Sequence, residues 1–318
     1  MFRRFSPGQS GKFRATVAAL LLLGAVSCAT AAPGPAPAAV QPSPGSSGLN
    51  GSHDGITPLL ATTLLRTGTQ RVSFLLIGAN TLVKAPEATV TTSYLDGASA
   101  GSQTAQADFH LWPYAIRGAY STELTFPQPG RWRLDISVED VEFAGTTQLV
   151  LEVADQLIVP DIGAIPPQSK TKTLEGEGGL KTLTTDFSPD PDLYLLSIDE
   201  AINSGKASVI VFASPAFCTS PTCGPQVDTV AELKDQHRGE ANFIHVEIYD
   251  NPEEIQGDLS QARITEAVKE WRFDQIPHWF NESWTYVLDS DGVVYQKFEG
   301  YATLEELDVA LQEASARS

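Results

Sequence analysis

The sequence predicts an all-β sandwich followed by an α/β domain that has a central mixed sheet and flanking helices. Two patterns support this fold class. Residues 56–156 hold short alternating runs separated by turns, whereas residues 197–314 alternate between strand-like and helix-like segments. The chain of 318 residues is long enough for two domains of ordinary size, and 42% of its residues are apolar, as in globular proteins.

The first 28 residues have the pattern of an export signal. Four basic residues precede an apolar run over residues 16–26, which is too short to be an ordinary membrane-spanning helix. The run ends at Ala25-Val26-Ser27-Cys28, which resembles the bacterial lipobox. The resemblance implies that Cys28 carries a thioether-linked lipid, and several acyl chains on one residue anchor a protein stably.

On this prediction the protein is lipid-anchored at the extracytoplasmic face of a bacterial cell membrane. The alternative is an ordinary cleaved signal or an uncleaved anchor, with Cys28 incidental. Residues 29–55 are rich in Ala, Pro, Gly and Ser, so they predict a disordered tether between the anchor and the first folded domain.

Composition restricts the partners of the folded part. The formal net charge of −18 argues against nucleic acid or anionic lipid as a partner, because both would repel the chain. The three cysteines are too few for a disulfide scaffold and suit a single working or structural pair.

Residues 56–156 contain the strands of the predicted sandwich. Residues 71–77 read as a strand, and residues 87–95 alternate up to a turn at Asp96-Gly97. Further strands are expected over residues 120–126, 132–138 and 148–153. The phrase from Gly118 to Leu134, with Tyr120, Phe126 and Trp132, resembles immunoglobulin-like modules of secreted bacterial proteins.

An aromatic cluster in this region is formed by His110, Trp112 and Tyr114, and we expect it to pack in the core rather than to bind a ligand. Residues 157–194 show no clear periodicity and predict a linker that leads into the next domain.

The elements of the last domain, residues 195–318, follow from Ser197 onward. Ser197 and Glu200 form a capping-box pattern for a short helix, and the apolar run over residues 208–213 suits a buried central strand. The later expected elements are a helix over 223–237, a strand over 242–249, a helix over 260–271, strands over 284–288 and 293–298, and a capped helix over 303–314. Parallel strands need a helical crossover, and the last two strands fit an antiparallel hairpin at the edge.

Cys218 and Cys223 come just after the first long apolar strand and at the start of the next helix. That element order and the segment from Val209 to Pro225 resemble the thioredoxin superfamily over residues 195–316, although four residues separate the cysteines where the family commonly has two. The resemblance implies a thiol–disulfide oxidoreductase that needs no cofactor and acts on extracytoplasmic protein thiols and disulfides.

The site residues implied by this resemblance are catalytic Cys218 and Cys223, with Phe217, Pro225 and Ser283 in support. A helix N-terminus carries partial positive charge, which favours thiolate, the form that attacks a disulfide. We expect Cys218 to attack and Cys223 to resolve. The reverse order stays open, because Cys223-Gly224-Pro225 is similar to the start of thioredoxin's Cys-Gly-Pro-Cys, and so does an inert structural disulfide.

Two features of the family are not found at their usual places. Ser283 stands before the strand where thioredoxins have a cis-proline, and the nearest proline is Pro277, so whether Pro277 takes that role stays open. The first strand also lacks the family's buried aspartate. Glu247 on the neighbouring strand could accept a proton instead, but we expect it to be a solvated strand residue.

Three other functions fit part of the pattern. The cysteine spacing matches peroxiredoxin Q, but Pro215 and Val211 stand where that family has a Thr or Ser and a Pro. A Sco-like protein for copper binding and delivery would use Cys218, Cys223 and His278 as ligands, with His245 a second histidine candidate. The third alternative is a non-catalytic interaction lipoprotein.

Overall fold

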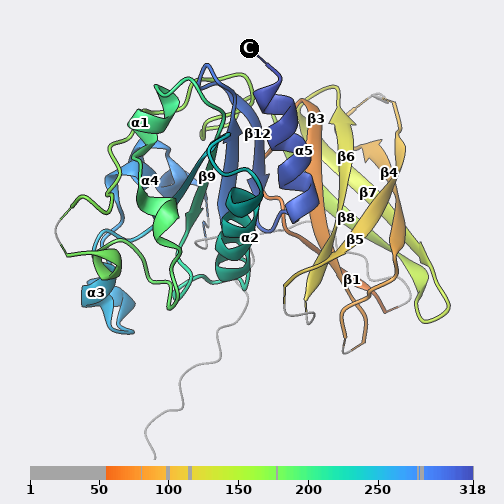
Figure 1. Cartoon of the computed structure of the whole chain (residues 1–318). Helices are drawn as coiled ribbons and strands as arrows, with labels where there is room; N and C mark the ends of the chain where they lie inside the picture. Colours follow the sequence, from red (N-terminus) through yellow and green to blue (C-terminus); the bar gives the residue numbers. More distant parts are fainter. Residues whose placement is uncertain are drawn as a thin grey trace, which may run out of the picture. The chain divides into compact units, whose positions relative to one another are not determined.

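Two hydrogen-bonded sheets organise the part of the chain that the structure describes (Figure 1). The structure is a computed structural model, and it describes residues 55–79, 81–97, 101–113, 117–176, 178–277, 279 and 283–317. The chain divides into the units Met1–Pro44 and Gly45–Ser318, and the described residues belong to the second. The predicted signal peptide, Cys28 and all but the last residue of the tether lie outside the described residues.

The first sheet is all-β, and its described strands follow the order β1-β3-β6-β5-β4-β7-β8-β2. Their bounds are Thr57–Leu60 (β1), Leu65–Arg66 (β2), Gly68–Ile77 (β3), Glu87–Tyr94 (β4), Thr104–Leu111 (β5), Gly118–Phe126 (β6), Gly130–Glu139 (β7) and Ala144–Ala154 (β8). Neighbours pair antiparallel except β2 and β8, which are parallel.

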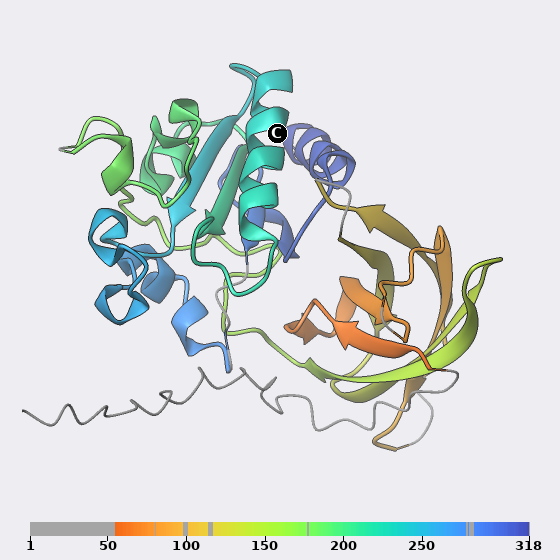
Figure 2. The same ribbon diagram turned by 90° about the horizontal axis from the view of Figure 1, so that it is seen from below.

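Alternation along the strands gives this sheet one apolar face. In β7, Trp132, Leu134, Ile136 and Val138 are all buried, and every second residue between them is more exposed. The predicted sandwich is not confirmed, because the ladder continues without a break through β6, β5, β4 and β7. One sheet curls around its own core instead (Figure 2).

The expected core role of the aromatic cluster is confirmed for Trp112. Trp112 is 7% exposed, and its ring lies 5.8 Å from the ring of Tyr301. Tyr114 lies outside the described residues.

The second sheet has the order β10-β9-β11-β12. Its strands are Ser208–Ala213 (β9), Asn242–Glu247 (β10), Trp284–Leu288 (β11) and Val294–Glu299 (β12). β9 and β10 are parallel and are joined through the helix α2 (Cys223–Gln236), whereas β11 and β12 form an antiparallel hairpin. The predicted α/β domain with a central mixed sheet is therefore confirmed at the level of strand order and direction.

Helices cover both faces of β9, which has neighbours on both sides. Val209 and Val211 pack with α2 and with α5 (Leu304–Ser315), whereas Ile210 and Phe212 pack with α1 (Ile198–Ile202) and α4 (Glu266–Glu270). All six residues of β9 are buried, as the apolar run predicts for a central strand.

The remaining helices are short. They are α3 (Pro252–Ile255) and the 3-10 helices Leu180–Thr182 (η1), Pro191–Tyr194 (η2), Leu259–Gln261 (η3) and Phe273–Gln275 (η4). Among the described helices, none has the length and apolar character needed to cross a membrane.

The continuous helix expected over residues 260–271 is wrong. The segment divides into η3 and α4, because residues between them extend the edge of β10. The amide of Asp250 donates to the carbonyl of Arg263 at 2.6 Å, and the amide of Thr265 donates to the carbonyl of Ile248 at 2.9 Å. These backbone hydrogen bonds replace those that a helix would need.

An ion pair joins Arg71, in strand β3 of the first sheet, to Glu306, in the helix α5 that packs on the second sheet. The Arg71 guanidinium reaches both carboxylate oxygens at 2.7 and 3.1 Å, and the Thr303 amide donates to Glu306 at 2.9 Å in a capping box. Burial alone would raise the pKa of Glu306, but Arg71 outweighs it and lowers the pKa to about 2.

Glu306→Gln should therefore weaken folding mainly at neutral pH. A carboxyl whose pKa falls from 4.5 to about 2 on folding stabilises the protein above pH 4.5, and this contribution is lost as pH falls through 2. Urea unfolding at pH 7 should show a loss of about 2–3 kcal/mol that shrinks toward pH 2. The neighbouring exposed Glu305→Gln is the control, and an equal loss in both variants would contradict this account.

Candidate functional site

Cys218 and Cys223 are joined by a disulfide at the carboxyl end of β9. Their Cα atoms are 5.9 Å apart, and Cys223 is the first residue of α2. The chain leaves β9 after Ala213, and the residues between Ala213 and Cys223 form a loop that returns to the sheet as α2. We call residues 214–222 the cysteine loop. The two predicted catalytic residues are thus brought together at a helix N-terminus.

The two cysteines differ in exposure. Cys223 is fully buried in the core between α2 and the sheet, whereas Cys218 is half-buried. An incoming sulfur would therefore reach Cys218 first, which favours Cys218 over Cys223 as the attacking residue.

Phe217 and Pro225, predicted as supporting residues, flank the pair. The half-buried Phe217 ring stands edge-on to Tyr249, with ring centroids 6.2 Å apart. Pro225 lies in the first turn of α2, and its carbonyl accepts a hydrogen bond from the Thr229 hydroxyl at 2.8 Å.

Ser283 lies against the start of α2. It is fully buried, and its Oγ is 3.2 Å from Thr222 Oγ1 and 3.0 Å from the Gly300 carbonyl oxygen. Ser283, which directly precedes β11, is therefore in contact with the residue before the first residue of α2. None of the described peptide bonds is cis, and that includes the bond before Pro277, so Pro277 does not supply a cis-proline.

Glu247, expected in solvent, is only 4% exposed, and that expectation is wrong. It ends β10, beside the start of the cysteine loop. The Thr185 amide and hydroxyl donate to its Oε2 at 2.8 and 2.7 Å, and the Ile248 amide donates to its Oε1 at 3.0 Å. Burial raises the pKa of Glu247, although the hydrogen bonds from Ser214 and Thr185 act in the opposite direction.

Thr185 connects this carboxyl to the cysteine loop. Its hydroxyl lies 3.3 Å from Ser214 Oγ and accepts from the Ala216 amide at 3.2 Å. The residues before α1 were predicted to be a linker, and sequence reasoning therefore missed Thr185, which has no periodic pattern around it.

His245 is held inside the same end of the sheet. The Tyr194 hydroxyl lies 2.7 Å from its Nδ1, and its Nε2 lies 3.1 Å from the Ala213 carbonyl oxygen. Since a carbonyl only accepts, Nε2 carries the proton and Nδ1 accepts from Tyr194. Burial lowers the pKa of His245 to about 4, so the ring is neutral at pH 7 and both its nitrogens are engaged.

Folding stability should consequently fall in mild acid. A histidine with a pKa of 6.5 unfolded and about 4 folded favours the native state above pH 6.5, and this contribution is lost as pH falls through 4. Urea unfolding should lose up to about 3 kcal/mol of stability from this group between pH 7 and pH 4. In the His245→Gln variant, the free energy of unfolding should change less between pH 7 and pH 4. An unchanged pH dependence in the variant would contradict the buried neutral ring.

The copper alternative is not supported by His245, since its nitrogens are already hydrogen-bonded. His278 lies outside the described residues. Within the described ranges, no three or more His, Cys, Asp or Glu side chains gather closely enough to hold a metal ion.

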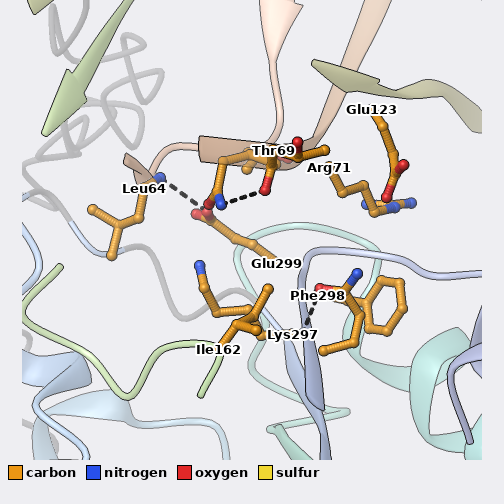
Figure 3. A pocket seen from close by; sticks show the side chains of 11 residues that line it. Leu64, Thr69, Arg71, Glu123, Ile162, Lys297, Phe298 and Glu299 are labelled. Carbon is orange, nitrogen blue, oxygen red and sulfur yellow. Dashed lines mark hydrogen bonds between the residues drawn. The ribbon is translucent and has the colours of Figure 1, made fainter. Parts of the chain in front are cut away.

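Two hollows occur away from the cysteine loop. The smaller, about 30 Å³, has room for about one water and is lined by Glu299, whose carboxylate accepts a hydrogen bond from the Leu64 amide at 3.1 Å (Figure 3). The Thr63 amide donates to the same carboxylate at 2.8 Å. A larger one, about 590 Å³, lies among residues of β5, β6, β12 and α5. Neither is lined by a residue of the cysteine loop, so they do not define the candidate site.

Comparison with known proteins does not identify a family. No protein-family model matches the chain, and no curated protein matches it. Two similar solved structures are a thioredoxin-family thiol:disulfide interchange protein from Chlorobium tepidum TLS and the CARDB domain of a Pyrococcus furiosus protein in complex with di-metal ions.

Both similarities are distant. The first is 14% identical, covers 46% of this chain and 97% of its own, and has a TM-score of 0.29. The second is also 14% identical, covers 34% of this chain and 93% of its own, and has a TM-score of 0.18. Neither similarity assigns a function to this chain.

Proposed function

We propose that this chain is a membrane-anchored, extracytoplasmic thiol–disulfide oxidoreductase that acts through Cys218 and Cys223. The observation that carries the proposal is the placement of the pair: one cysteine half-buried in a loop, and its partner buried as the first residue of α2. A disulfide required only for stability would not need one accessible sulfur, and so short a loop contributes little entropic stabilisation.

We also infer the fold of each of the two domains from the resemblances seen in the sequence. The parallel β9–α2–β10 unit and the antiparallel β11–β12 hairpin support a thioredoxin-like domain. We assign the curled all-β part to an immunoglobulin-like module, as the phrase around Tyr120 and Trp132 suggests. The anchor is the lipid on Cys28, which the lipobox-like sequence supports.

The proposed chemistry is thiol–disulfide exchange. The Cys218 thiolate attacks one sulfur of a client disulfide, forming a mixed disulfide while the other client sulfur leaves as a thiolate. The Cys223 thiolate then attacks Cys218 Sγ, which releases the second client thiolate. The client gains two electrons, and the pair loses two and returns to the disulfide seen here.

Another extracytoplasmic dithiol would have to reduce the pair for a further cycle, and a client dithiol would drive the same steps in reverse. Glu247 is a buried carboxyl at this end of the sheet, on the strand next to the one in which the resemblance implies a proton acceptor, and we assign it that role instead. Its raised pKa suits a group that must take up a proton.

Replacing the resolving cysteine should trap the intermediate. Reduced Cys223→Ser protein mixed with oxidised insulin should accumulate a mixed disulfide through Cys218, visible on a non-reducing gel and located by peptide mass spectrometry. Cys218→Ser should accumulate at least tenfold less, because its remaining thiol is buried.

The double variant Cys218→Ser/Cys223→Ser controls for reaction at Cys28. Adducts that form equally in the double variant, or no adduct in Cys223→Ser, would contradict the proposal. Preferential trapping in Cys218→Ser would instead make Cys223 the attacking residue.

A further inference from the structure

Residues 300–302, which we call the strap, lead from β12 to the cap of α5 and are held by two side chains of the first sheet. The Arg71 guanidinium, from β3, donates to the Tyr301 carbonyl at 3.1 Å. The ring of Trp112 lies 5.8 Å from the ring of Tyr301, and the two residues are only 7% and 9% exposed. Trp112 itself is fixed after β5, because its amide donates to the Arg117 carbonyl at 2.8 Å.

The strap also contacts the first two turns of α2. The Tyr301 hydroxyl lies 3.1 Å from Thr229 Oγ1, and the Ala302 amide donates to Gln226 Oε1 at 2.6 Å. The Thr229 hydroxyl donates to the Pro225 carbonyl at 2.8 Å. Since a hydroxyl has one proton to donate, Tyr301 is the donor to Thr229. Two residues of the strap therefore hold two residues of α2.

The first turn of α2 is the part of the helix that acts on the cysteine pair. Cys223 is the first residue of this turn, and the disulfide joins it to Cys218. The partial positive charge of a helix N-terminus is confined to its first turn, so a thiolate is stabilised only while that turn keeps its place. The Gln226 amide donates to the Thr222 carbonyl at 2.8 Å in this turn, so Gln226 joins the strap to the helix start through both its side chain and its backbone.

We infer that the first sheet positions the N-terminal turn of α2 through the strap, and that Trp112 and Tyr301 are positioning residues for the chemistry of Cys218. Trp112 holds the ring of Tyr301, and the Tyr301 hydroxyl holds α2 through Thr229. The reactivity of a cysteine beside the second sheet thus depends on a side chain of the first sheet. The inference rests on the proposed function of the cysteine pair.

Trp112→Ala should raise the pKa of the Cys218 thiol in the reduced protein. Removing the indole leaves a cavity beside Tyr301, so the phenol and the helix turn that it holds gain freedom to move. The helix N-terminus then stabilises the thiolate less. We expect the pKa to rise by roughly half a unit, which lowers the rate of alkylation at Cys218 about threefold at any pH below that pKa.

Tyr301→Phe separates the hydroxyl link from the packing of the ring. The phenylalanine ring can still pack on Trp112, but the hydrogen bond to Thr229 is lost, and the pKa of Cys218 should again rise by roughly half a unit. If both substitutions act through the strap, the shift in the double variant Trp112→Ala/Tyr301→Phe should be clearly smaller than the sum of the two single shifts.

The measurement is the pH dependence of carbamidomethylation at Cys218 in the reduced full chain, followed by peptide mass spectrometry. Leu111→Ala is the matched control, since Leu111 is 48% exposed and next to Trp112, and its rate profile should match that of the unsubstituted protein. Ile136→Ala is a second control, because Ile136 is buried in the core of the first sheet. It should lower the free energy of unfolding without moving the rate profile, which separates a loss of stability from a loss of positioning.

An unchanged rate profile in Trp112→Ala, an equal shift in Ile136→Ala, or fully additive shifts in the double variant would overturn the inference. If Trp112→Ala does not fold, Tyr301→Phe removes only one oxygen atom and decides alone, with an unchanged profile again overturning the inference. The trapping experiment gives a separate answer. A raised pKa in a protein that forms no mixed disulfide would contradict the proposed function and leave the role of the strap standing.

Discussion

The complete burial of β9 is the constraint on which the candidate site depends. β9 is hydrogen-bonded to β10 on one side and β11 on the other, and helices cover both its faces. Its carboxyl end therefore has little freedom to move. Three parts of the site leave from this end or from a strand paired with it: the cysteine loop follows β9, Glu247 ends β10, and Ser283 precedes β11.

Two buried titratable side chains at this end of the sheet, His245 and Glu247, are hydrogen-bonded. His245 stays neutral between Tyr194 and the Ala213 carbonyl, and Glu247 accepts hydrogen bonds from backbone and hydroxyl donors. These hydrogen bonds offset the cost of burying the two polar side chains, and they also join the elements that carry them. The sulfurs thus sit in a rigid frame in which only Cys218 is open to a partner.

Much of the second sheet was predictable from sequence because its strands are continuous apolar runs and two of its helices carry capping boxes at Ser197 and Thr303. The cysteine pair was predictable because it follows one of these apolar strands and stands at the start of the next helix. The burial of Glu247 was not, because it depends on Thr185 in a segment without periodicity. The broken helix near Arg263 and the unbroken ladder of the first sheet likewise depend on backbone pairing between distant segments, which side-chain patterns do not encode.

The most direct test of the central claim is the reduction potential of the Cys218–Cys223 pair, measured by equilibration with glutathione buffers and quantified by thiol alkylation. A working exchange pair should equilibrate in the range of about −270 to −120 mV found for thioredoxin-like oxidoreductases. A potential well below about −300 mV, typical of structural disulfides, would show that the pair stabilises the fold and takes no part in exchange.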